Sequence, residues 1–147
     1  MANFHNFALL AILAGTAAIG QSIGNGSLNG KFFARHLMLS VSTNGAITEA
    51  RTFYGSLTFD GAGSFAYTGT QLVGGASPAP MSGAGTYSIK ATGIMTLSNF
   101  QRTDSSTIRA GLGQGALIGS TTESAGVYDL FVAVPAPTSG VDRKSVV

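Results

Sequence analysis

Few side chains of this chain could carry out chemistry. The only histidine between the two terminal segments is His36, there is no cysteine, and the acids stand apart from one another. Catalysis by a serine nucleophile needs a histidine held between the hydroxyl and a carboxylate, so His36 is the one candidate base. It lies mid-strand beside Arg35, whose charge would lower its basicity at close range. We therefore expect His36 to be a partly covered strand residue.

The acids of the central part fit structural roles better than catalysis. A carboxylate pair for glycoside hydrolysis needs two acids facing each other about 5–10 Å apart. Asp60 and Asp104 lie in turn sequences, where aspartate is favoured for its local hydrogen bonds. The remaining acids lie in or near predicted strands, and we expect them to pair with arginines: the acids are Glu49, Glu123 and Asp129, and the arginines are Arg35, Arg51 and Arg109. The sequence thus predicts no catalytic residue and no enzyme.

The sequence contains no motif typical of a metal or cofactor site. With one central histidine and no cysteine, zinc and copper would lack their preferred ligands. Residues 60–63 read Asp-Gly-Ala-Gly and lack the alternating oxygen ligands of a calcium loop. Residues 111–115 are glycine-rich without the spacing of a dinucleotide-binding loop, and the glycosylation sequon at 25–27 is a frequent chance match. We predict no metal site and no cofactor, and no pattern identifies ligand-binding residues.

The composition favours one folded, turn-rich β domain. The chain has 147 residues, 21 of them glycine, and only 10% are charged. Disorder requires low hydrophobicity with high charge, and 147 residues suit a single core. Before residue 142 the lysines and arginines are scattered singly, and the net charge is only +2, so we predict no nucleic-acid partner. Without cysteine there is no disulfide framework.

Residues 1–20 are predicted to be a signal peptide, with cleavage before Gln21. The apolar run at 7–19 has about 13 residues, against roughly 20 needed to span a bilayer, so no permanent membrane span is expected. The leader has no lysine or arginine, and a buried N-terminal helix is the alternative. Export predicts a secreted or cell-surface location, and residues 21–30, small and polar, form a leader loop.

The C-terminal end divides into two predicted pieces. Residues 135–141 begin with Pro-Ala-Pro and read as the start of a stiff linker, which usually leads to another domain. Residues 142–147 resemble a translated sequencing adapter and are predicted to be a non-native tail, a short polar tail being the alternative. We therefore expect further domains of the same chain as partners, while other partners remain unknown.

Alternating apolar residues predict a β domain over 31–134. The segment 55–67 recurs as 85–97, each reading strand, tight turn with Gly63 or Gly93, strand. Asn44 and Gly45 predict a type I′ turn, Gly55 a bulge or bend, and the prolines of 74–80 a long exposed loop. The expected strands are 31–41, 47–59, 64–73, 85–90, 94–100, 107–112, 116–121 and 127–134. A single helical turn is the alternative for the seventh.

Eight sequential strands with short turns make an antiparallel meander. We favour an up-and-down barrel over a two-sheet sandwich, because closure removes both sheet edges. The strand over 32–41 is apolar on both faces, so we expect the core on one side and a loop or second layer on the other. The aromatic residues could line a ligand cavity or fill a packed core: they are Phe32, Phe33, Phe53, Tyr54, Phe59, Phe65, Tyr67, Tyr87, Phe100, Tyr128 and Phe131.

The motifs at 29–33, 57–63, 85–89 and 129–135 together resemble an uncharacterised β-rich module near the N-terminus of large exported bacterial proteins. The resemblance covers about residues 28–137, rests on strand and turn motifs, and transfers no active site. It implies an all-β module that commonly precedes repeat or immunoglobulin-like domains. We expect a non-catalytic structural or interaction module of a larger surface or secreted bacterial protein. The alternative is a lipocalin-like carrier of a small apolar ligand.

Overall fold

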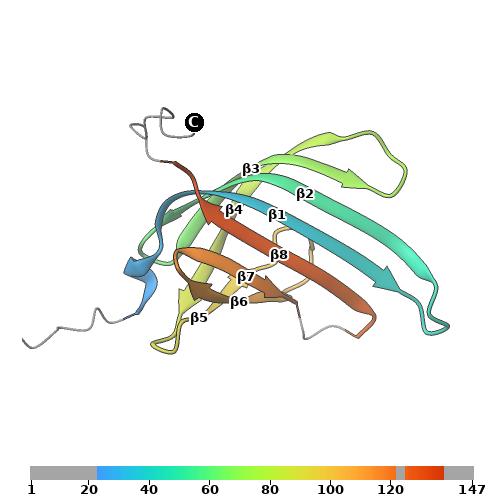
Figure 1. Cartoon of the computed structure of the whole chain (residues 1–147). Helices are drawn as coiled ribbons and strands as arrows, with labels where there is room; N and C mark the ends of the chain where they lie inside the picture. The colour runs from blue at the N-terminus through green and yellow to red at the C-terminus, as the bar shows by residue number, and fades with distance from the viewer. Residues whose placement is uncertain (1–22, 122–124, 138–147) are drawn as a thin grey trace, which may run out of the picture.

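The computed structural model of the chain shows a closed eight-stranded antiparallel barrel and describes residues 23–121 and 125–137 (Figure 1). Each strand pairs with its neighbour in sequence, and β8 returns to pair with β1. The predicted up-and-down barrel is therefore confirmed. The elements are the 3₁₀ turn η1 (Asn25–Ser27) and the strands β1 (Asn29–Val41), β2 (Ile47–Asp60), β3 (Ser64–Val73), β4 (Ala79–Ile89), β5 (Ile94–Ser98), β6 (Thr107–Gly113), β7 (Ala116–Ser120) and β8 (Val127–Pro135).

The repeated hairpin pattern is confirmed as the β2–β3 and β4–β5 hairpins. In the first, Asp60 Oδ1 accepts hydrogen bonds from the backbone N–H groups of Ala62, Gly63 and Ser64 at 2.8–3.0 Å. In the second, the Gly93 N–H donates to the Lys90 carbonyl at 2.9 Å. Both turns end on a glycine with positive φ, +121° at Gly63 and +81° at Gly93, a conformation that glycine adopts without steric cost.

The hairpin at Asn44 and Gly45 forms, but the predicted type I′ turn is wrong. Of these two residues only Gly45 has a positive φ, +83°, whereas a type I′ turn needs both. The Gly45 N–H donates to the Ser42 carbonyl, and the Ser42 N–H to the Ala46 carbonyl, each at 2.9 Å. A type I′ pair occurs instead between β6 and β7, where Gln114 and Gly115 have φ values of +53° and +77°.

Of the bulge or bend predicted at Gly55, the bulge does not form, and β2 runs through this residue without a break. The register runs through Gly55 without a shift on both sides, pairing it with Ala34 and Gly69. A Cβ at Gly55 or Gly69 would lie within 3 Å of the Phe53 ring and of the opposite backbone. The two facing glycines therefore make room for this ring, and the register shift of β1 against β2 lies at Ser40 and Val41.

Strand β4 begins earlier than predicted, at Ala79, so the exposed loop is shorter than 74–80. Pro80 pairs with Thr70 of β3, although proline cannot donate to a ladder. The reason is that β4 pairs with β5 only over Tyr87, Ser88 and Ile89. At Pro80 the strand is locally an edge, where proline is tolerated.

The barrel interior is filled by aromatic and aliphatic side chains. Phe100, which follows β5, packs against Phe53 and Tyr67 with ring centroids 5.0 Å apart in each case. Phe59 lies 5.1 Å from Tyr87 and 5.4 Å from Phe32 in edge-to-face contacts. Such contacts add to the hydrophobic stabilisation of the core. For the inward aromatic residues the packed core is the alternative observed, whereas Phe33, Tyr54 and Tyr128 are exposed on the outer surface, in neither of the predicted places.

The segment before β1 closes one end of the barrel. Leu28 is fully buried, and the Tyr87 hydroxyl lies 2.9 Å from its carbonyl and 3.1 Å from that of Asn25. The Asn25 side chain accepts a hydrogen bond from the Ile89 N–H at 2.8 Å. Burial raises the pKa of the Tyr87 hydroxyl. Within the predicted leader loop, the described residues thus form a plug, and β1 starts two residues earlier than expected.

Candidate functional site

His36 lies inside the barrel and not at its partly covered surface as predicted. Successive residues of a strand point to opposite faces, so His36 points inward while Arg35 points out, with its guanidinium over the Tyr54 ring. The His36 side chain is fully buried between the rings of Phe100 and Phe131. Arg35 therefore has no part in setting its environment.

The partner of His36 is Asp129 of β8, whose side chain is also fully buried. His36 Nε2 lies 2.7 Å from Asp129 Oδ2, and Asp129 Oδ1 accepts the Thr121 N–H at 2.6 Å. Burial acts to raise the pKa of Asp129, but the hydrogen bonds from His36 and Thr121 outweigh it and the pKa is lowered. The predicted arginine partner of Asp129 is wrong, because the inward face of β8 meets the inward face of β1.

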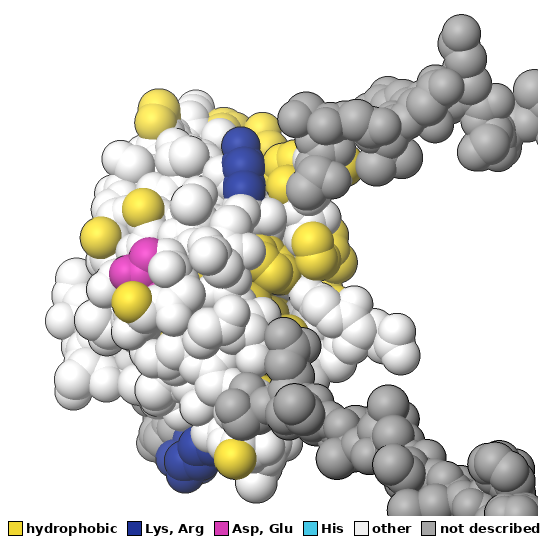
Figure 2. All heavy atoms as spheres, turned by 90° about the vertical axis from the view of Figure 1, so that its left-hand side faces the viewer, with side chains coloured by type: hydrophobic (Ala, Val, Ile, Leu, Met, Phe, Trp, Pro, Cys, Tyr) yellow, Lys and Arg dark blue, Asp and Glu magenta, His cyan; other side chains and the backbone are white. Residues whose placement is uncertain are grey.

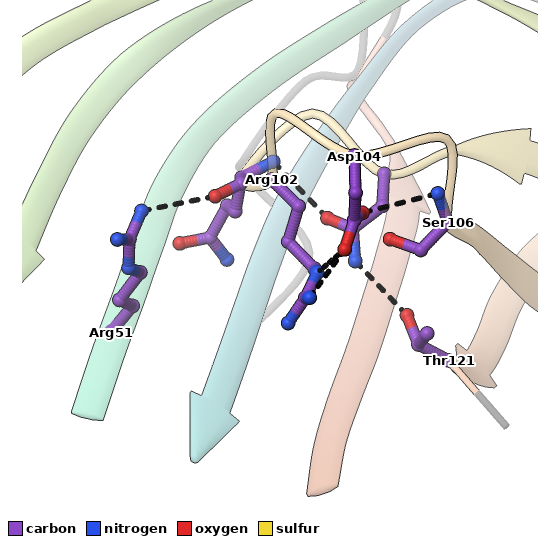
Figure 3. A network of polar contacts seen from close by, with 7 residues as sticks. Arg51, Arg102, Asp104, Ser106 and Thr121 are labelled. Atoms are coloured by element: carbon purple, nitrogen blue, oxygen red, sulfur yellow. Dashed lines mark hydrogen bonds and ion pairs between the residues drawn. The ribbon is translucent and has the colours of Figure 1, made fainter. Parts of the chain in front are cut away.

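The pair belongs to a closed ring of hydrogen bonds, the polar ring, formed by His36, Asp129, Thr121, Asn99 and Gln101. Asn99 Nδ2 donates to Thr121 Oγ1 at 3.0 Å (Figure 3). Asn99 Oδ1 accepts the Gln101 N–H at 3.1 Å, and Gln101 Nε2 donates to the His36 carbonyl at 3.2 Å. The ring ties β1, β8 and the end of β7 to the β5–β6 connection. The ring is only partly satisfied, because His36 Nδ1 and Gln101 Oε1 are buried without a hydrogen-bond partner in the protein.

A cavity of about 190 Å³, the rim cavity, lies beside the polar ring at the barrel rim. Arg51 reaches from β2 to the β5–β6 connection, where its Nη1 donates to the Gln101 carbonyl at 3.1 Å (Figure 3). Its Nη2 lies 2.7 Å from Glu49 Oε1, which lowers the pKa of Glu49 and confirms the predicted pairing of that acid with an arginine. The cavity is lined by Met38, Glu49, Arg51, Gln101, Arg102, Thr103 and Asp104.

Asp60 and Asp104 have the turn roles predicted for them. Asp104 Oδ2 pairs with Arg102, whose Nε lies 2.8 Å away, and Oδ1 accepts the Ser106 N–H at 3.1 Å (Figure 3). The Arg102 hydrogen bond holds the pKa of Asp104 well below its usual range. Hydrogen bonds from the amides of Ser64, Ala62 and Gly63 likewise lower the pKa of Asp60. Asp104 also lines the rim cavity, together with Glu49.

The outer surface carries a second feature, an exposed apolar face over β1, β7 and β8. The register places Leu37 opposite Leu130 and Leu39 opposite Tyr128. Leu37, Leu130 and Tyr128 are 46%, 52% and 64% exposed. We name this surface the β1–β8 face; its residues are Phe33, Leu37, Leu39, Ile118, Tyr128, Leu130, Val132 and Val134. In Figure 2 hydrophobic side chains group on the right, the side that β1 and β8 form at the front of Figure 1. No described residue supplies the covering layer predicted for it.

The charges of the β1–β8 face are all of one sign. Lys31 lies over the Phe33 ring, with 5.7 Å from Nζ to the ring centroid, and Arg35 lies 5.8 Å from that of Tyr54. The outward residues described on β1 and β8 include no carboxylate, because Asp129 points inward. A groove of about 170 Å³ on the face is lined by Leu37, Leu39, Tyr128, Asp129 and Leu130.

The opposite side of the barrel has a different composition. The outward positions of β3 and β4 are small and mostly hydroxyl-bearing, including Ser64, Thr68, Ser82 and Thr86. Single exposed apolar residues are ordinary, but a contiguous patch on a small domain is typical of an interaction surface. Six of the ten exposed large hydrophobic residues described belong to the β1–β8 face, and the other four, Ile23, Ile47, Tyr54 and Ile94, are not part of it.

Several sequence predictions concern residues away from these sites. Glu123 lies outside the described residues. The glycines of 111–115 belong to β6 and to the β6–β7 turn. Among the residues that the structure describes, no group of three histidine or acidic side chains could hold a metal ion, and no helix is long and apolar enough to cross a membrane.

Sequence reasoning missed Asn99 and Gln101 as members of a polar network. Their signal is weak: two amides separated by one residue at the end of a strand, next to the buried Phe100. Comparisons with protein-family models, curated proteins and solved structures gave no match for this chain.

Proposed function

We propose that this chain is a non-catalytic interaction module of a larger exported protein and that it binds a partner protein through the β1–β8 face. The observation that carries the proposal is the apolar surface itself, which is contiguous across β1, β7 and β8 and holds six of the ten exposed large hydrophobic residues described. The groove between Leu37, Leu39, Tyr128 and Leu130 offers a site for an apolar anchor of the partner, the kind of contact that dominates binding energy.

The charges of the face support a partner with apolar and acidic side chains. Arg35 and Lys31 would meet carboxylates of such a partner favourably. Two copies of this chain packed through the same face would bring like charges together without a carboxylate between them. Charge complementarity therefore favours an acidic, apolar protein surface over a second copy.

The interior supports an interaction role more than a carrier role. Aromatic rings in contact fill the space in which a small apolar ligand of a lipocalin-like carrier would lie. The imidazole of His36 has no exposed surface, so a substrate has no direct access to it. Export is proposed from residues 1–20, and linkage to further domains from the Pro-Ala-Pro segment.

Selection of random peptides displayed on phage against the full chain tests the proposal. Enriched peptides should combine aliphatic or aromatic residues with Asp or Glu. Their affinity should fall at least tenfold in a Leu37→Ser, Leu130→Ser double variant and in Arg35→Glu. Thr68→Glu places the same charge on β3 and should leave binding unchanged.

Four outcomes would overturn the proposal. Selected peptides could lack acids or bind the face variants as well as the parent chain. Sedimentation could show that the parent chain is a dimer and the Leu37→Ser, Leu130→Ser variant a monomer, which would assign the face to a second copy. Phosphatidylglycerol vesicles could bind the parent chain but not the Leu37→Ser, Leu130→Ser variant, which would assign the face to a lipid surface.

A further inference from the structure

We infer that the first half of β4 is an open sheet edge through which two copies of this chain pair. The barrel is closed, but β4 pairs with β5 only over residues 87–89, whereas it pairs with β3 over residues 79–86. In Figure 1 the β3–β4 hairpin reaches well beyond the end of β5, toward the upper right. The stretch 79–85, which we name the β4 edge, therefore has a described partner strand on one side only. It is separate from the β1–β8 face, and its pairing goes beyond the proposed function.

The hydrogen bonds of β4 indicate which backbone groups point to the open side. In an antiparallel strand the N–H and C=O of a residue point to the same side, and successive residues point to opposite sides. The Thr86 N–H donates to Ser98 Oγ of β5 at 3.0 Å, so the N–H groups of Ser82 and Ala84 and the carbonyl of Pro80 point the same way. All three residues are exposed. A row of unpaired backbone groups of this kind is a template for a strand of another chain.

A second copy of β4 fits the β4 edge because the free groups are self-complementary. In antiparallel pairing about Ser82, the Ser82 N–H donates to the partner's Ser82 carbonyl. The Ala84 N–H donates to the partner's Pro80 carbonyl, so every free N–H group of the two edges is used. Proline has no N–H, which removes one possible hydrogen bond per chain. The arrangement has two-fold symmetry, so it closes as a dimer and leaves no further edge of β4 open.

The charges near the β4 edge also favour a second copy. Residues 61–89 contain no charged side chain, so two copies can approach through β3 and β4 without electrostatic repulsion. The β1–β8 face differs, because its cations would repel those of a second copy. Native sheet edges are commonly protected by a charged side chain, above all lysine. The β4 edge has no such protection, and its outward residues Ser82 and Ala84 are small enough for close approach.

The inner side of the β4 edge offers an apolar contact to the second copy. The Tyr67 hydroxyl lies within 3 Å of the place where a Cβ of Gly83 would be, so this ring extends over Gly83 toward the open side. Pairing about Ser82 sets the partner's Met81 opposite Gly83, beside the ring. Met81 and Tyr67 are both only partly buried in the single chain, and contact between a methionine sulfur and an aromatic ring is favourable. By symmetry the dimer contains this contact at both ends of the pairing.

The test is sedimentation velocity on the full chain from about 10 μM to about 1 mM, because an interface this small gives a transient dimer. We expect the average mass to rise toward that of a dimer. Ser82→Asp and Ser82→Lys each set like charges directly opposite one another, and each should weaken the dimer about fivefold or more. An equal mixture of the two variants should restore it. Ser88→Asp makes the same change where β5 already pairs with β4 and should dimerise as the parent chain does.

Three results would overturn the inference: a parent chain that stays monomeric at every concentration, a dimer that Ser82→Asp leaves unchanged, and a mixture of the folded charge variants that stays monomeric. Circular dichroism checks that the variants are folded. If a charge variant does not fold, Ser82→Pro replaces it, since it removes the central N–H without removing a hydrogen bond to β3. The Leu37→Ser, Leu130→Ser variant should dimerise as the parent chain does, so this inference and the proposed function can fail separately.

Discussion

Replacing His36 with leucine should destabilise the barrel strongly, because it removes the main partner of a buried carboxylate. The two side chains are fully buried and their bonded atoms lie 2.7 Å apart. In His36→Leu the Asp129 carboxylate keeps its Thr121 donor but loses the imidazole. Breaking a buried pair from one side costs about 3–5 kcal/mol, so His36→Leu should lower the free energy of unfolding by that amount.

The reverse replacement and the double replacement make the prediction sharper. Asp129→Leu leaves the imidazole and the Thr121 N–H without their acceptor, at about 1–3 kcal/mol for each unpaired group. The double variant leaves neither a buried carboxylate nor an unpaired imidazole, and apolar replacement of a whole buried pair is often neutral. Its cost should therefore fall below the sum of the single costs by about 2–3 kcal/mol, the upper range of couplings between bonded residues.

Urea unfolding followed by far-ultraviolet circular dichroism and tyrosine fluorescence measures these costs, since the chain has no tryptophan. Arg35→Leu is the matched control: it removes a cation from the neighbouring outward position, where contact with an exposed ring contributes about 0.5–1 kcal/mol. Single costs that add to within about 0.5 kcal/mol in the double variant would refute a direct bond between His36 and Asp129 inside the barrel.

Four further predictions test the pH dependence, the packing, the plug and the leader. Because the pKa of Asp129 is lowered in the folded state, the carboxylate contributes fully to stability above its unfolded-state pKa of about 3.9, and this contribution is lost as the pH falls through its folded-state pKa. The difference in unfolding free energy between the parent chain and Asp129→Asn should therefore narrow below pH ~4. A constant difference would contradict this. Gly69→Ala, whose methyl group would meet the Phe53 ring and the Tyr54 carbonyl, should cost about 1–3 kcal/mol in urea unfolding, whereas Gly111→Ala, with open space around its Cβ, should cost less than half as much. Tyr87→Phe should cost about 1 kcal/mol and speed hydrogen exchange at Leu28; unchanged exchange there would rule out the hydroxyl as the plug's anchor. After expression of the full chain in a bacterial host, mass spectrometry should show a mature N-terminus at Gln21. An intact Met1 would contradict the export prediction.

Much of the barrel was predictable because its determinants are local. Alternating apolar and polar residues predicted the bounds of β2, β3 and β8 to within two residues. Gly63 and Gly93 predicted where the chain reverses. The start of β4 was not predictable locally, since proline at Pro80 is tolerated only because β5 is too short to reach it. The turn at Gly45 depended on the hydrogen bonds of Ser42 and Ala46, which composition does not specify.

The sites were less predictable than the strands because they depend on long-range register. Residues 32–41 are apolar on both faces, so the pattern alone does not say which side turns inward. The inward side is selected by packing across the barrel and by Asp129, which lies 93 residues from His36 in sequence. The same choice leaves Leu37 and Phe33 outside, and with them the β1–β8 face.

The most direct test of the central claim is a map of the surface that a selected peptide contacts. Amide chemical shifts of the isotope-labelled chain, followed as the peptide is added, report this surface residue by residue. Our account predicts shifts concentrated at the outward residues of β1 and β8, strongest around Leu37 and Leu130, with Thr68 and its neighbours on β3 unmoved. Shifts confined to β3 and β4, or to the rim cavity, would contradict it.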